Sequence, residues 1–205
     1  MADNRFNLPE GVRMADLSGI EEGFDENRVN DRYCLIRVNV SAENIAPYFL
    51  KLIQILEEPG FFVIELPVSK TEEKALRKKD SDPCHKHVYY LDGITHNKAF
   101  RIFNQYQHLF VNDGMVNFGF GSITHEEVFV GAYKIFEIYT PEPEKFLNLF
   151  ESMSIKRSEC LKTVRNNISP DTPGERCTIE CEPSIRDMLG EVMKMGFYLA
   201  DTRED

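Results

Sequence analysis

The stretch from Met115 to Thr140, MVNFGFGSITHEEVFVGAYKIFEIYT, constrains the fold of this chain more than any other. Apolar side chains recur in it at alternate positions, beginning with Val116, Phe118 and Phe120. Alternate spacing places side chains on one face of a pleated strand. The pattern therefore predicts strands near residues 115–120, 127–130 and 132–139, with a hairpin turn or exposed loop at 122–126.

Strand-like and helix-like patterns alternate along the rest of the chain. A continuous apolar run bounded by Pro-Gly and Pro67 predicts an interior strand at 61–66, whereas apolar residues at helical spacing follow a candidate N-cap at Ser41. Further strands are predicted near 33–40, 87–91, 177–182 and 197–199, and helices near 41–58, 95–111 and 184–195, with a short polar helix and loop over 69–82. Another helix is predicted after Pro143 and ends near Ser152. Because these elements do not follow a regular βαβ repeat, we expect an α+β fold, with helices packed on a largely antiparallel sheet in a single domain.

Acidic residues are concentrated at the start of the chain. Residues 1–31 contain eight acidic and three basic side chains and few large apolar ones. Such a segment buries too little apolar surface to offset the entropy lost on ordering. We therefore expect residues 1–31 to form an acidic N-terminal arm or loosely packed loop, followed by a single α+β domain over residues 32–205.

Composition narrows the classes of function. No apolar run approaches the length of a membrane-spanning helix, and the N-terminus lacks the basic-then-apolar order of a signal peptide. The five scattered cysteines are typical of reduced thiols, so we expect a cytoplasmic protein that is not bound to a membrane. Basic residues do not form a patch with interleaved aromatics, which disfavours nucleic-acid binding. The basic cluster at Lys74, Arg77, Lys78 and Lys79 is interpreted as a solvated loop or helix end.

Two groups of residues could support chemistry, and each has a simpler interpretation. Cys84, His85 and His87 could bind zinc together with Cys177 and Cys181 if the two segments adjoin, although packed or exposed thiols would have the same spacings. Cys84 could also be a nucleophile, but no third group that would orient a neighbouring imidazole is identifiable.

The second group is His125, Glu126 and Glu127, which has the composition of an acid–base site and equally that of an exposed polar turn or contact surface. No strong catalytic motif occurs elsewhere in the chain. We therefore predict no cofactor, no metal and no catalytic residues, and a metal-binding protein or hydrolytic enzyme that uses one of these two groups is the alternative.

Three segments occur in a fixed order along the chain, namely NDG-MVNFGFGS, EVFVGAYKIFEIYT and a Pro-Gly-Glu loop at Pro173 to Glu175. This order resembles that of small bacterial proteins, some of which are similar to immunity proteins. Immunity proteins of this kind are encoded beside contact-dependent or polymorphic toxins. The resemblance covers roughly residues 85 to 180 and rests on strand patterns and turns. It implies a non-enzymatic protein that neutralises one cognate toxin domain by blocking its active or substrate-binding surface.

The charge balance suits such a role. The formal net charge is -10, and many toxin nucleases carry basic substrate surfaces that an acidic inhibitor can match. If binding is the function, acidic residues near exposed aromatics are the first candidates for the interface. These candidates are Glu21, Glu22, Asp25 and Glu26 in the N-terminal segment, and His125, Glu126 and Glu127 in the predicted hairpin loop.

Overall fold

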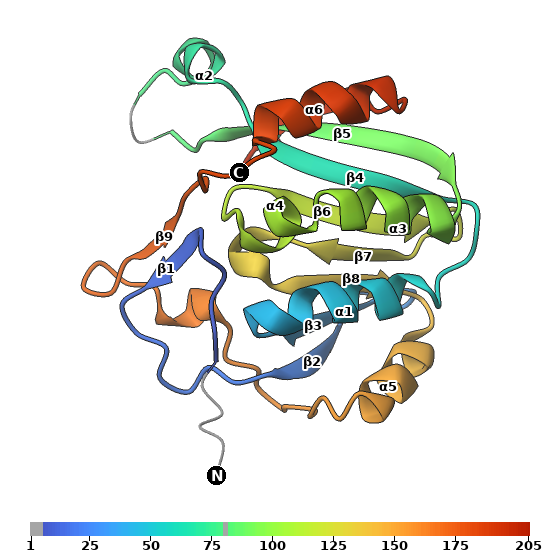
Figure 1. The fold of residues 1–205 in the computed structure, drawn as a ribbon. Coiled ribbons are helices and arrows are strands. Elements are labelled where there is room, and N and C mark those ends of the chain that lie inside the picture. Colours follow the sequence, from blue (N-terminus) through green and yellow to red (C-terminus); the bar gives the residue numbers. More distant parts are fainter. Residues whose placement is uncertain (1–5, 80–81) are drawn as a thin grey trace.

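An eight-stranded antiparallel sheet organises the chain in a computed structural model that describes residues 6–79 and 82–205 (Figure 1). Its strand order is β10-β5-β4-β6-β7-β8-β3-β2, and every neighbouring pair is antiparallel. The strands are β2 (Gly23–Arg28), β3 (Cys34–Asn39), β4 (Gly60–Pro67), β5 (His85–Ile94), β6 (Asn117–Ser122), β7 (Glu127–Val130), β8 (Phe136–Thr140) and β10 (Tyr198–Glu204). A separate two-stranded sheet pairs β1 (Val12–Met14) with β9 (Gly174–Arg176).

Helices lie over one face of the large sheet, with α1, α3, α4 and α6 in front of it in Figure 1. The helices are α1 (Ala42–Ile53), α2 (Lys70–Leu76), α3 (His96–Gln105), α4 (Gln107–Asn112), α5 (Pro143–Ser152) and α6 (Ile185–Lys194), with short 3-10 turns at η1 (Ala132–Lys134) and η2 (Val164–Asn167). All of these α-helices except α2 bury side chains. The predicted α+β class, with helices packed on an antiparallel sheet in a single domain, is confirmed.

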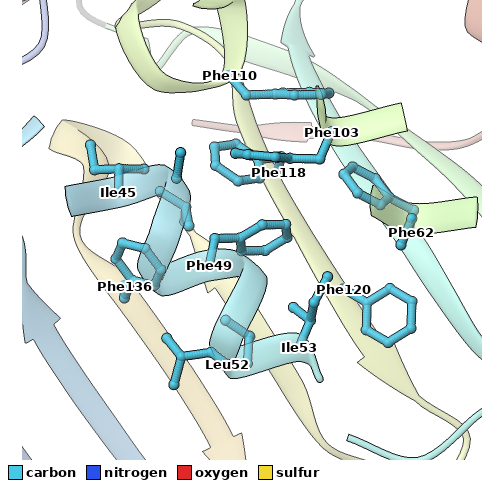
Figure 2. Close-up of a cluster of buried hydrophobic side chains, with 14 of the residues drawn as sticks. Ile45, Phe49, Leu52, Ile53, Phe62, Phe103, Phe110, Phe118, Phe120 and Phe136 are labelled. Carbon is cyan, nitrogen blue, oxygen red and sulfur yellow. The ribbon is translucent and has the colours of Figure 1, made fainter. Parts of the chain in front are cut away.

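The hydrophobic core lies between this helical layer and the sheet. Phe49 of α1 is fully buried and packs against Phe103, Phe118 and Phe62, with ring centroids 5.0, 4.9 and 6.2 Å away (Figure 2). The strand residues in this cluster occupy alternate positions, as the sequence pattern predicts, and point toward the helices. Alternation thus leaves the intervening residues on the opposite face of the sheet.

The expectation of a loosely packed arm over residues 1–31 is corrected for residues 6–31. Part of this segment is β2, which pairs with β3 from Gly23 to Arg28 and extends the large sheet. Phe24 is only 4% exposed, and its ring centroid lies 4.7 Å from that of Phe150 on α5. Backbone pairing and one well-placed aromatic side chain therefore order a segment whose composition is poor in apolar residues.

Two local predictions also differ from the structure. The single strand predicted over 132–139 begins instead with η1, where Tyr133 and Lys134 adopt positive φ angles of 60° and 59°, and β8 starts only at Phe136. The strand predicted over 177–182 is not formed; the nearest strand is β9, at Gly174–Arg176. Among the described residues, no helix has both the length and the apolar character that crossing a bilayer would require.

Candidate functional site

The face of the large sheet opposite the helices carries an unusual set of side chains. On the helical face, Phe62, Phe118 and Phe136 are fully buried, whereas on the opposite face Phe61 is only half-buried and Tyr139 is 39% exposed. We call this opposite surface the open face, and it comprises Phe61, Val63, Tyr90, Gly119, Gly121, Glu127, Phe129, Glu137 and Tyr139.

Strand register brings the residues of the open face together from five strands. One row crosses the sheet through directly paired residues, in the order Glu137, Phe129, Gly119, Val63 and Tyr90. A second, adjacent row runs in the same way through Tyr139, Glu127, Gly121 and Phe61. Directly paired residues on one face are close enough for their side chains to interact. Two carboxylates and four aromatic rings therefore share one continuous surface.

The two glycines of β6 shape this surface. A β-carbon at Gly121 would lie 2.2 Å from the tip of the Phe61 ring, and one at Gly119 would lie 2.9 Å from the Phe129 ring. The aromatic rings thus occupy the space above the glycines, and Phe61 also packs against Tyr90 with ring centroids 5.4 Å apart. Because rings from neighbouring strands fill the glycine positions, the centre of the open face is apolar.

The carboxylate of Glu127 lies within this apolar surface. Among the described residues, none forms a hydrogen bond or an ion pair with it, and burial together with the neighbouring Glu137 raises its pKa. Glu137 itself has two cationic neighbours, namely Arg165 at 3.5 Å and Arg37, its directly paired residue on β3, which also pairs with Asp25. A carboxylate that is partly desolvated and repelled by a second acid gains free energy when an external cation approaches it.

The predicted cluster at His125, Glu126 and Glu127 is divided by the structure. His125 is exposed at the hairpin turn with φ of 69°. Glu126 is buried, and it accepts a hydrogen bond from the Thr140 hydroxyl at 2.6 Å and pairs with Lys145 of α5 at 2.5 Å. Only Glu127 lies on the open face, because successive residues of a strand point to opposite faces.

The predicted acidic residues of the N-terminal segment mostly have partners within the chain. Glu22 accepts hydrogen bonds at 2.8 Å from the backbone N–H of Ser41 and from the Asn44 side chain, which holds the start of α1. Buried Asp25 pairs with Arg37 at 2.5 Å, and Glu26 pairs with Arg157 at 3.1 Å. These contacts favour a structural role for the three residues, and Glu21 is exposed.

The candidate metal or catalytic residues contact other groups. Nδ1 of His85 lies 3.0 Å from Glu73, and His87 lies between Thr202 at 2.9 Å and Glu72 at 3.3 Å. Within the part of the chain that the structure describes, no group of three or more His, Cys, Asp or Glu side chains is placed to hold a metal ion. The structure thus does not assemble Cys84, His85 and His87 with Cys177 and Cys181, the five residues proposed from the sequence.

Sequence patterns do not identify most residues of the open face as parts of one site. The signal for Glu137 and Tyr139 was present, because both alternate with the apolar residues of β8. Phe61 was assigned to an interior strand, and only the pairing of β4 with β6 shows that its ring faces away from the helices. Comparison with protein-family models, curated proteins and solved structures gives no match to this chain. Its candidate site is therefore defined by its own residues alone.

Proposed function

We propose that this chain is a non-catalytic binding protein whose open face binds a basic surface of another protein. The observation that carries the proposal is the Glu127 carboxylate, which lies among aromatic rings on a sheet surface and has no ion pair within the described part of the chain. Aromatic residues are enriched at protein interfaces and supply most of the binding energy where they are desolvated. Carboxylates within such a surface select a positively charged partner.

Arginine is the partner side chain that fits this surface best. Its guanidinium group is planar, so it can donate to Glu127 or Glu137 while it stacks on a neighbouring ring such as Phe129 or Tyr139. A lysine would satisfy the charge but not the stacking. We therefore expect the partner to place at least one arginine over Glu127 and the adjacent Glu137, with apolar side chains over Phe61 and Tyr90.

The resemblance to immunity proteins suggests what the partner is. A cognate toxin domain with a basic, nuclease-like substrate surface would be blocked when the open face covers that surface. The net charge of -10 would speed the encounter of the two proteins, and attraction between opposite charges weakens as salt rises. We place this inhibition in the cytoplasm of the cell that makes both proteins.

Replacing both carboxylates of the open face tests the proposal. The double variant Glu127→Gln/Glu137→Gln keeps the side-chain shapes, and we expect it to bind the protein encoded by the neighbouring gene about 10 to 100 times more weakly, since a hydrogen bond to a charged group contributes about 1.5–3 kcal/mol. Titration calorimetry at low and high salt measures the loss.

The matched control is Glu144→Gln/Glu151→Gln, which removes the same charge from exposed positions on α5. We expect the control to change affinity little at high salt, where long-range attraction is screened. If both double variants bind as tightly as the unchanged protein, the open face is not the binding site.

A further inference from the structure

A second candidate site lies beside α2. A cavity of about 570 Å³ opens between α2, residues 77–79 and the start of β5. This volume is within the range of sites that bind small molecules. Five basic side chains line the cavity, namely Lys70, Lys74, Arg77, Lys78 and Lys79. The basic cluster, whose pattern predicts a solvated loop or helix end, thus borders a cavity.

Positive charge is in excess at this cavity. Two carboxylates also line it, but Glu73 is hydrogen-bonded to His85 at 3.0 Å and Asp205 is held by Lys86 and Arg176, each at 2.6 Å. By contrast, the ion pairs formed among residues 6–79 and 82–205 do not involve the four lysines of the cavity. In a chain of net charge -10, this concentration of cations indicates a site for an anion.

One wall of the cavity is apolar. Pro67, Val68 and Met115 line it, and Val68 is only 8% exposed. An inorganic anion would need only the cationic wall, whereas a molecule that joins anionic groups to an apolar or aromatic body would use both walls. Lysine ammonium groups are common ligands of phosphate.

We propose that this cavity binds a small polyanion that carries phosphate groups on an aromatic body, such as a nucleotide. The phosphates lie among the lysines of α2 and the following loop, and the aromatic body lies against Val68 and Met115. A long nucleic acid fits less well, because the acidic remainder of the chain repels a phosphate backbone. This site shares no residue with the open face, so the two proposals are tested independently.

The thiol of Cys84 reports occupancy directly, because Cys84 is exposed and lines the cavity. With ATP as the probe, we expect alkylation of Cys84 by N-ethylmaleimide to slow about tenfold at ten times the dissociation constant of ATP, since only the unoccupied fraction reacts. Cys160 is exposed outside this cavity and serves as the internal control. Inorganic triphosphate is expected to protect Cys84 only at higher concentration, because it lacks the aromatic body. Peptide mass spectrometry gives both alkylation rates.

Two double variants separate a specific site from general attraction. We expect Lys74→Gln/Lys78→Gln to raise the ATP concentration that protects Cys84 by about tenfold or more, since each of the two substitutions removes a charged hydrogen-bond donor. Lys51→Gln/Lys98→Gln removes the same charge from exposed positions on α1 and α3 and is expected to leave protection of Cys84 unchanged. Three results would each overturn the proposal. They are equal effects of the two double variants, equal protection of Cys84 and Cys160 by ATP, and no protection of Cys84 by ATP.

Discussion

Between pH 7 and about pH 9.5, the free energy of unfolding will rise by about 3 kcal/mol through the single side chain of Lys134. Burial lowers the pKa of Lys134 to about 7, against a partial opposing attraction from Asp113. Its Nζ donates to the backbone carbonyl of Val116 at 2.5 Å. In the unfolded chain the same amine titrates near its ordinary pKa of about 10.4. The unfolded state therefore binds more protons within this window, so stability increases with pH.

The variant Lys134→Met isolates this contribution. Other charged groups near Lys134 remain in both proteins, namely Asp113, Lys86 and Arg176, so the difference between the two stability curves reports Lys134 together with its interactions with these groups. We expect the curve of the variant to rise by about 3 kcal/mol less across the window. Urea unfolding at half-unit pH steps measures both curves. Parallel curves would show that Lys134 keeps an ordinary pKa in the folded protein.

Replacing Phe49 with alanine is expected to cost about 3–5 kcal/mol of the free energy of unfolding. Phe49 is fully buried, and three aromatic rings surround it at the centre of the core (Figure 2). Its removal leaves a cavity that rings held by both α3 and the sheet cannot readily fill. Because the total stability of a domain is about 5–15 kcal/mol, the variant will be close to unfolding at 25 °C.

Tyr48→Ala is the matched control for this core prediction. Tyr48 precedes Phe49 on α1 but is only half-buried, so its loss should cost about 1 to 2 kcal/mol. Denaturant midpoints of the two variants give the comparison. Equal losses at the two positions would mean that the packing between α1 and the sheet is not centred on Phe49.

The alternation of apolar and polar residues predicted most strands of the large sheet. These strands pair regularly with their neighbours, so their residues alternate between the two faces. The alternation through Phe118 and Phe120 locates β6 to within two residues, for example. The pattern failed at Cys177 to Glu182, where the backbone N–H of Cys177 donates to Gly11 and that of Ile179 donates to the Asp113 carboxylate. Hydrogen bonds to distant residues outside a sheet do not change the spacing of apolar residues along the sequence, so the sequence pattern does not reveal them.

The candidate site was predictable only in part for the same reason. Glu127 was identified as an acidic residue near aromatics, but it was grouped with His125 and Glu126 as one loop. The rings that surround Glu127 come from strands far apart in the sequence, such as Phe61 on β4 and Tyr139 on β8. The neighbours of Glu127 therefore follow from the register of the whole sheet, which no single segment determines.

Hydroxyl-radical footprinting of the complex with the neighbouring gene product tests most directly whether the open face is the binding surface. We expect oxidation of Phe61, Phe129 and Tyr139 to fall on binding, because the partner would cover these partly exposed rings. Met193, which is 43% exposed on α6 over the helical face, should be oxidised equally in the free and bound protein. Protection of Met193, with unchanged oxidation of Phe129 and Tyr139, would contradict the account.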